Sequence, residues 1–336
     1  MPIAAQLPPI LHNSRAKPRK VGFEIEFTGI SLAATAQIIA KIYAGEIQPV
    51  HRNRISIKTQ TYGDFIVELD VKLLQRLSQE VHNAQALQTT EQLDMQLKQF
   101  TVDVLSPMLV NIAPTEIVTP PLPFSELITL DKLCQLLRES FAKGTRASIM
   151  YAFGVHINPE VPAFDVATLQ RYLLAFVLLY DWLKVKSQMD LTRQATQFAK
   201  AYPKAYVELL VNKTYQDLDI LMDDYLLYNP TRNRALDMLP LFSYLNAKKV
   251  KAKVTDERIK PRPTFHYRLP NCQIDEPNWS ILQPWNLWVS VEKLAYDSKG
   301  LHQLGKRYKS YLSSLSYNLN SDSWVAEIEA WLDKNP

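Results

Sequence analysis

The alternation of apolar and polar positions predicts five β-strands in this chain. They cover residues 22–28, 64–70, 115–119, 153–158 and 264–269. Side chains along a strand alternate between its two faces, so each segment has one apolar face and one polar face. If the strands form one sheet, its polar face gathers carboxylate, imidazole and guanidinium groups. Like charges at this density need cations to neutralise them, and the pattern therefore indicates a metal site.

The spacing of apolar residues between these strands predicts mainly helices. Asp165 is a typical N-cap for an amphipathic helix whose apolar stripe runs from Val166 to Tyr180. Other helices are expected over residues 32–43, 125–142 and 197–246, and three more after the last strand. Residues 72–108 are polar and helix-prone, 54–58 resemble a further strand, and the lysine-rich stretch 248–253 is expected to be an exposed loop.

The clean alternation favours an α+β fold, with a mainly antiparallel sheet and helices packed on its apolar face. A parallel α/β sheet is the alternative, because long helical insertions separate the strands. Residues 1–19 are expected to form a flexible or loosely docked arm. Residues 20–336 then form a single domain, with helical insertions at about 165–250 and a C-terminal helical segment at about 280–333.

Composition narrows the class of protein. The 336 residues are 47% hydrophobic and 21% charged, which is typical of a globular chain with a sizeable core. Cys134 and Cys272 are the only cysteines, which excludes a disulfide framework and favours a reducing compartment. The most apolar run, 173–180, is far shorter than the roughly 20 residues of a membrane span. We therefore expect a cytoplasmic protein with no membrane partner.

Nucleic acid is not expected as a partner either. The net charge of +4 is mild, and the lysines at 248–253 have no interleaved aromatic residues for base stacking. The chain has only 8 glycines and lacks glycine-rich phosphate-binding loops, so arginines and metal ions would have to bind any phosphate. Trp285 and Trp288 have helical spacing, which favours a role in core packing.

The candidate metal ligands are acids and a histidine on polar strand faces. Glu24 and Glu26 lie about 7 Å apart on one face, near enough to bind or bridge cations. Ordinary surface glutamates and a structural histidine are the alternative. Glu68, Glu116 and His156 recur in similar strands and strengthen the metal interpretation. Hard oxygen ligands suit Mg²⁺ or Mn²⁺ better than zinc.

The candidate phosphate ligands are arginines in two segments. Thr231 is a plausible N-cap that would place Arg232 and Arg234 in a first helical turn, where cations oppose the helix dipole unless an anion docks. Ion pairs are the alternative: Arg234 with Asp237, and Arg232 with Asp223 or Asp224.

The second segment places Arg268 beside His266 on a polar strand face. Its planar guanidinium can bind two oxygens of a phosphate at once. An ion pair with Asp70 is the competing interpretation. The sequence alone leaves both open.

Several of these motifs occur together, in order, in one known family. They are Val21–Phe27 and residues 65–70, 114–121, 154–158 and 229–234, and with them the chain resembles the amidoligase family. This family belongs to the carboxylate–amine ligases related to glutamine synthetase and gamma-glutamylcysteine synthetase. The resemblance implies a curved antiparallel sheet, a glutamine-synthetase-like catalytic domain that holds Mg-ATP and forms an amide bond through an acyl phosphate.

The resemblance also implies roles for individual residues. The metal-binding residues would be Glu24, Glu26, Glu68, Glu116 and His156. The residues that contact ATP or its transferred phosphate would be Arg232, Arg234, Arg268 and Asn158. Asn158 stands where the family pattern has a second histidine, and His266 stands where the superfamily often has an acid. Arg232, Arg234 and Arg268 would stabilise the charge of the transferring phosphoryl group.

Two other functions remain open at this point. A metal-dependent phosphohydrolase would use the same acids and histidine, and a non-catalytic relative would bind nucleotide or a partner protein without turnover. The sequence gives the substrates only as a small-molecule or peptide carboxylate and an amine. It does not specify the oligomeric state.

Overall fold

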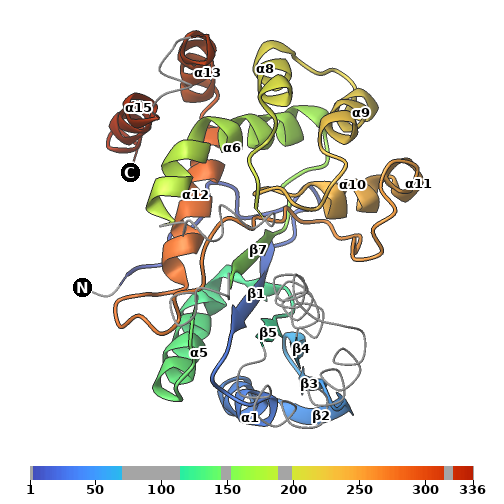
Figure 1. Cartoon of the computed structure of the whole chain (residues 1–336), viewed down its shortest axis with the longest axis vertical. Helices are drawn as coiled ribbons and strands as arrows, with labels where there is room; N and C mark the ends of the chain where they lie inside the picture. Colours follow the sequence, from blue (N-terminus) through green and yellow to red (C-terminus); the bar gives the residue numbers. More distant parts are fainter. Residues whose placement is uncertain (1–2, 70–113, 145–152, 188–198, 314–320, 336) are drawn as a thin grey trace, which may run out of the picture.

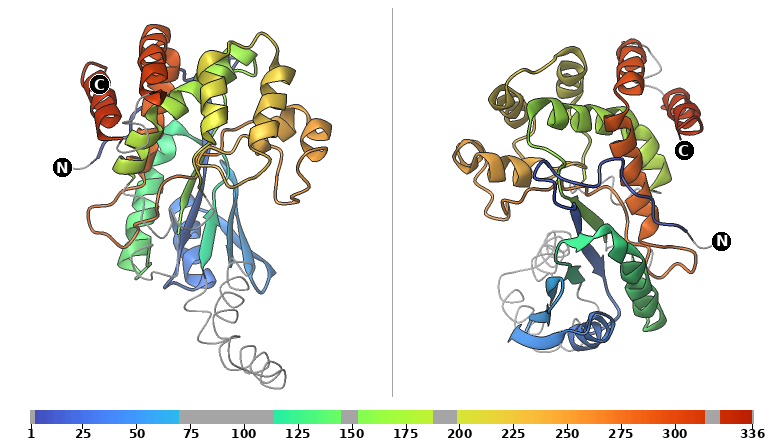
Figure 2. Two further views of the ribbon diagram at one scale, coloured as in Figure 1. Left: turned by 45° about the horizontal axis from the view of Figure 1, so that its top comes forward. Right: turned by 180° about the vertical axis from the view of Figure 1, so that it is seen from behind.

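The computed structural model describes residues 3–69, 114–144, 153–187, 199–313 and 321–335. Figure 1 shows a sheet with helices α1 Leu32–Tyr43 and α5 Leu127–Glu139 at one end of the molecule and a group of helices at the other. Strands β1 Lys20–Phe27 and β7 Val155–Pro159 run from the sheet toward the helical part and connect the two. The two further views in Figure 2 show the same division.

Every strand pairing in the sheet is antiparallel. The strands are β1 Lys20–Phe27, β2 Glu46–His51, β3 Arg54–Thr59, β4 Gly63–Leu69, β5 Thr115–Val118, β6 Leu122–Pro123 and β7 Val155–Pro159. Their order is β2-β3-β4-β5-β1, and both β6 and β7 also pair with β1. The α+β fold with an antiparallel sheet is confirmed, and the parallel alternative is wrong. β1 is the central strand because it pairs with three others, β5, β6 and β7.

The apolar face of the sheet forms the core of this half. In β1, Val21, Phe23, Ile25 and Phe27 are fully buried, while the residues between them are partly exposed. α1 Leu32–Tyr43 packs on β3 and β4, and α5 Leu127–Glu139 packs on α1. These helices match the expectations for residues 32–43 and 125–142. The alternation along β1 therefore gives the strand one buried apolar face and one partly exposed polar face.

The helical half is built around α6 Val166–Lys186. Its N-cap is Asp165, as expected, and the Asp165 carboxylate accepts from the Thr168 amide at 2.8 Å. α6 is long and apolar enough to cross a membrane by length and composition alone, but most of it is buried inside the protein. The helices packed on it include α8 Lys204–Asn212, α9 Leu218–Tyr228, α12 Leu282–Tyr296, α13 Ser298–Leu312 and α15 Asp322–Leu332. Trp285 and Trp288 of α12 are fully buried, which confirms their role in packing.

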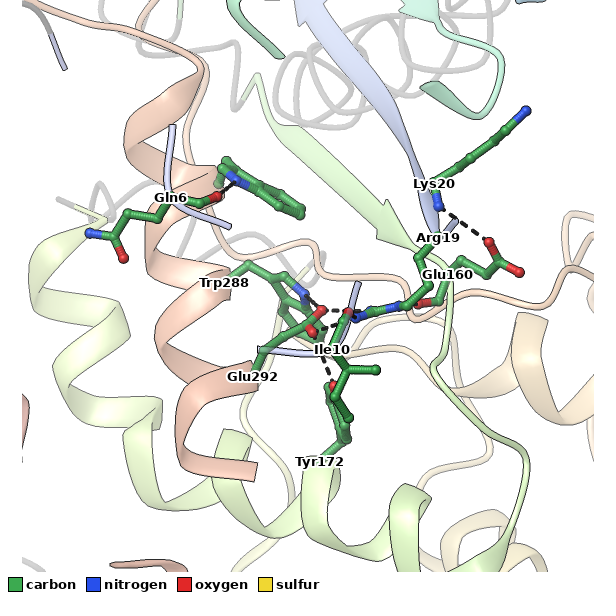
Figure 3. A network of polar contacts seen from close by, with 9 residues as sticks. Gln6, Ile10, Arg19, Lys20, Glu160, Tyr172, Trp288 and Glu292 are labelled. Carbon is green, nitrogen blue, oxygen red and sulfur yellow. Dashed lines mark hydrogen bonds and ion pairs between the residues drawn. The ribbon is translucent and has the colours of Figure 1, made fainter. Parts of the chain in front are cut away.

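The N-terminal segment was expected to be loosely attached, and its described residues instead make specific contacts with α12. The carbonyl of Gln6 accepts from the Trp285 indole at 2.8 Å, and its amide donates to Asn286. Arg19 is 1% exposed and forms a two-pronged ion pair with Glu292 at 2.7 and 2.8 Å (Figure 3). These long-range bonds attach the segment to the protein.

Three local predictions were wrong or incomplete. Residues 264–269 form isolated bridges with β7, such as Ile157 with Tyr267, and no regular strand within this described segment, since prolines flank it on both sides. The lysine-rich stretch is mostly a short helix, α11 Ala247–Lys251, anchored by the buried Val250. β2 was not anticipated from the sequence. In the structure its residues are mostly exposed and show no alternation of burial. The expected helix over 72–108 lies outside the described residues.

The arginine segment at 229–234 also differs from the prediction. Helix α10 is Leu239–Leu245, so Thr231 does not cap a helix that contains Arg232 and Arg234. Residues 234 and 236 instead form bridges with Lys200 and Tyr267. These pairings with other parts of the chain accompany bends and isolated bridges where local signals favoured a helix.

Candidate active site

A row of acids crosses the polar face of the sheet. Glu26 of β1 is the direct cross-strand partner of Glu116 of β5, and Glu116 is in turn the partner of Glu68 of β4. Cβ atoms of such partners are about 5 Å apart, so these carboxylates repel each other unless cations intervene. Glu68 has such a cation, because Arg54 of β3 donates to it at 2.7 Å. Glu26 and Glu116 are therefore the two acids of this row that face each other directly across β1 and β5.

β7 places a histidine next to this row. His156 is the cross-strand partner of Glu24, and its Nδ1 lies 2.8 Å from Glu24 Oε2. The other ring nitrogen, Nε2, lies 3.9 Å from Glu26 Oε1. The amide of Gly154 donates to Glu26 Oε2 at 2.7 Å. One imidazole thus connects the two acids of β1.

The segment beside β7 completes the cluster with three polar groups. Asn158 donates its amide to Glu24 Oε1 at 3.1 Å, and its carbonyl oxygen lies 2.8 Å from His266 Nδ1. Arg262 lies 3.1 Å from Glu24 Oε1 and 3.0 Å from His266 Nδ1. Asn158 is therefore in the cluster as expected, in contact with Glu24 and His266.

Among the residues that the structure describes, two groups have the geometry to hold a cation. Glu26, Glu116 and His156 form one, and Glu24, His156 and His266 form the other. In each group the potential ligand atoms lie within 4.8 Å of one another. The first group offers two carboxylates and one imidazole, a donor set that fits Mg²⁺ or Mn²⁺. The predicted ligands Glu24, Glu26, Glu116 and His156 are thus brought together, whereas Glu68 is paired with Arg54.

The electrostatics of the cluster stabilise the charged form of Glu24. Burial alone would raise the pKa of Glu24, but His266, His156 and Arg262 together hold it well below its usual range. Burial lowers the pKa of His266, Glu24 opposes this shift, and the positive charges of Arg262 and Arg268 add to it. The carboxylate of Glu24 therefore remains ionised, whereas burial disfavours the charged form of the His266 imidazole.

Arg268 contacts Arg232 and lies near enough to His266 to affect its pKa. Arg268 donates its backbone amide to Ala235 and its guanidinium to the carbonyl of Arg232. Burial lowers the pKa of Arg232, and the charge of Arg268 lowers it further. Arg234 makes different contacts, because its guanidinium donates to the carbonyls of Ala201 and Tyr228. Of the three predicted arginines, Arg268 and Arg232 are therefore the pair next to the cluster.

Two residues of this region were missed from the sequence. Arg262 has the same strand parity as His266 and Arg268, so a longer period-two analysis of this segment would have placed it on the same face. Asp237 is fully buried and interacts with the charges of Arg268, Arg232 and Arg262. Nothing in the local sequence distinguishes it from an ordinary helix-capping acid.

The polar face of this antiparallel sheet, together with the segment beside β7, brings acids, histidines and an arginine into one cluster that could hold a cation. The chain belongs to the amidoligase family: the family described as "Putative amidoligase enzyme" matches residues 17–290, which include the whole cluster. The resemblance drawn from the motifs is confirmed, and membership supports a ligase that forms amide bonds. Neither the curated proteins nor the solved structures gave a significant match.

Proposed function

We propose that this protein is an ATP-dependent ligase that joins a carboxylate to an amine through an acyl phosphate. The observation that supports it most directly is the shared histidine. His156 belongs to both cation groups, and Arg268, which contacts Arg232, lies near enough to His266 of the second group to lower its pKa. Anionic phosphates need such positive neighbours, and the family supplies the amide-forming chemistry.

The residues Glu26, Glu116 and His156 would hold the cation. Their donor set fits a hard divalent ion, and the direct opposition of Glu26 and Glu116 gives the sheet a reason to bind one. When bound, Mg²⁺ or Mn²⁺ would neutralise charge on the phosphates of ATP. The amide of Gly154 and the carboxylate of Glu24 fix Glu26 and His156 in place before any ligand arrives.

Arg268 and Arg232 would bind the γ-phosphate. The substrate carboxylate attacks the γ-phosphorus, the bond to the β-phosphate oxygen breaks, and ADP leaves. The amine then attacks the carbonyl carbon of the acyl phosphate and releases inorganic phosphate. Guanidinium groups stabilise the charge that builds on the equatorial oxygens during the first step. Arg268 is held for this task by two hydrogen bonds: its backbone amide donates to the Ala235 carbonyl and its guanidinium donates to the Arg232 carbonyl.

A thermal-shift titration tests this proposal. ATP is added with and without Mg²⁺ to the wild type, to Glu116→Gln, and to Glu208→Gln, which changes an exposed glutamate on α8. A ligand at 100 times its Kd stabilises a protein by about 2.7 kcal/mol, which shifts the melting temperature measurably. We expect a Mg²⁺-dependent shift that is lost only in Glu116→Gln.

Product analysis then separates the three functions. ADP and phosphate that accumulate only with both a carboxylate and an amine, together with a new amide, support the ligase. Phosphate release without any amine identifies a phosphohydrolase. An ATP shift with no turnover under any substrate combination identifies a non-catalytic relative. No shift in any protein contradicts nucleotide binding at this site.

A further inference from the structure

The contacts of Glu24 differ from those of the other acids in the cluster. Its carboxylate faces three nitrogen groups, of His156 at 2.8 Å, Asn158 at 3.1 Å and Arg262 at 3.1 Å. Both oxygens are used, since Oε2 faces His156 and Oε1 faces the other two. A metal ligand needs a lone pair aimed at the ion, whereas the lone pairs of Glu24 are aimed at protein donors.

The contact between Glu24 and His156 decides which ring nitrogen can bind an ion. A carboxylate acceptor at 2.8 Å requires that Nδ1 of His156 carry a proton. In its neutral form the ring then has its lone pair on Nε2, the nitrogen on the side of Glu26. A histidine that binds metal through one nitrogen commonly donates its other N–H to a carboxylate, which fixes the tautomer and the ring orientation. Glu24 occupies that orienting position.

Arg262 lies where a second cation would have to bind. Its guanidinium is 3.1 Å from Glu24 and 3.0 Å from His266, which are two of the three members of the second group. Its backbone is restrained, because Pro263 follows it and its amide donates to the Pro240 carbonyl. A fixed guanidinium at this position supplies one positive charge and repels a divalent ion.

We propose that the two acids of β1 have different tasks. Glu26 binds a single divalent ion with Glu116 and Nε2 of His156. Glu24 is a positioning residue that orients His156, and Arg262 takes the place of a second ion beside it. This inference deepens the proposed function and rests on a cation site in the sheet. Under this proposal the site holds one divalent ion, and the guanidinium of Arg262 supplies the second positive charge.

Counting bound Mn²⁺ in the absence of nucleotide tests the proposal. The full chain is titrated with Mn²⁺ and the free ion is measured by electron paramagnetic resonance, for the wild type and four variants. The variants are Glu24→Gln, Glu116→Gln, Arg262→Ala and a control, Arg307→Ala. The guanidinium of Arg307 on α13 pairs with Glu327 on α15, outside the cluster. Circular dichroism confirms that each variant is folded.

The wild type and the Arg307→Ala control should bind one Mn²⁺ per chain. Glu116→Gln should lose this binding, whereas Glu24→Gln should keep one Mn²⁺ at 10–100-fold weaker affinity, the range found when an orienting partner is removed. Arg262→Ala should bind two, because Glu24 and His266 then face an open position. Two ions in the wild type, or one ion in Arg262→Ala, would overturn the role of Arg262.

Histidine nitrogen chemical shifts give a test that needs no variant. In ¹⁵N-labelled wild type, addition of Zn²⁺ as a diamagnetic probe should shift Nε2 of His156 and leave Nδ1 protonated. Loss of the Nδ1 proton would show that the ion binds on the side of Glu24 and would overturn its orienting role. Failure of the wild type to bind any Mn²⁺ or Zn²⁺ would instead contradict the proposed function itself, so the two failures are distinguishable.

Discussion

Glu116 stands directly opposite Glu26 across β5 and β1, and no turn or insertion within either strand disturbs this register. Like charges in such positions destabilise a sheet. A divalent ion held by both carboxylates would offset this repulsion. Fold stability and cation binding are linked through this pair.

Glu116→Gln should lower stability relative to the wild type only where a divalent cation is present. In a chelator the two proteins should differ by no more than about 1 kcal/mol, the size of one cross-strand interaction. In saturating Mg²⁺ the wild type should be the more stable, because only it gains the free energy of binding. Urea unfolding under both conditions measures the two differences.

Glu68→Gln is the matched control for this experiment. Glu68 lies in the same row but pairs with Arg54, and both side chains are about one-third exposed. Its loss should therefore cost no more than about 1 kcal/mol, with or without Mg²⁺. If Glu68→Gln showed the same Mg²⁺-dependent loss of stability as Glu116→Gln, the cation site would have to include β4.

Arg268 and Arg234 should differ in what their substitution affects. Arg268→Lys should lower the rate of ADP formation by roughly 10²-fold, because an ammonium group does not reproduce the planar fork. Arg234→Met should instead lower the melting temperature, since its guanidinium connects the Ala201 and Tyr228 carbonyls. Steady-state rates and thermal unfolding of both variants separate the roles. A larger rate loss in Arg234→Met would reverse the assignment.

The polar face of the sheet could be predicted from the sequence because it depends on strand periodicity alone. The alternation in β1 and β7 places Glu24, Glu26, His156 and Asn158 on one face wherever the strands pair. The pairing itself could not be predicted. That Glu116 opposes Glu26, and that Glu68 is neutralised by Arg54, depends on strand register, which is determined by the packing of the whole sheet.

The local errors have a common physical cause. Thr231 has the properties of an N-cap, but Leu236 forms a bridge with Tyr267 and Arg234 forms one with Lys200, and helix α10 begins only at Leu239. Arg19 was placed in a loose arm because its partner Glu292 lies 273 residues away. In each case a contact with a distant part of the chain outweighs the local preference.

Asp237 should make the protein less stable as the pH rises through about 6. Burial raises its pKa from 3.8 to about 6, although Arg268, the Leu239 amide, Arg232 and Arg262 oppose the shift. Because the folded state holds the proton more tightly than the unfolded state, its contribution is full below pH 4 and is lost as the pH passes 6. The loss amounts to about 3 kcal/mol at neutral pH.

Asp237→Asn should remove this loss, so that its stability relative to the wild type increases between pH 4 and pH 7. Urea unfolding across this range measures the difference. Asp256→Asn is the control of opposite sign, because Arg258 lowers the pKa of Asp256 to about 2 and its contribution is lost only in acid. A constant difference between Asp237→Asn and the wild type would show that Asp237 is ionised in the folded protein.

The Arg19–Glu292 pair should contribute far more to stability than an ion pair on the surface. Both side chains are fully buried, and Glu292 also accepts from Tyr172 at 3.0 Å and from Trp288 at 2.8 Å (Figure 3). Glu292→Gln leaves the Arg19 guanidinium buried without a counter-charge, which should cost about 3–5 kcal/mol. The surface variant Glu327→Gln, which breaks a pair with Arg307, should cost less than about 1 kcal/mol.

A double variant tests whether the two charges act together. Arg19→Met combined with Glu292→Leu removes both charges, so its cost should be smaller than the sum of the two single costs by about 0.5–3 kcal/mol. It should not be neutral, because Tyr172 and Trp288 lose their acceptor. Limited proteolysis should also cut the N-terminal segment of Glu292→Gln faster than that of Glu327→Gln, since Arg19 anchors this segment. Equal stability and equal cleavage in the two single variants would show that the buried pair does not hold the segment in place.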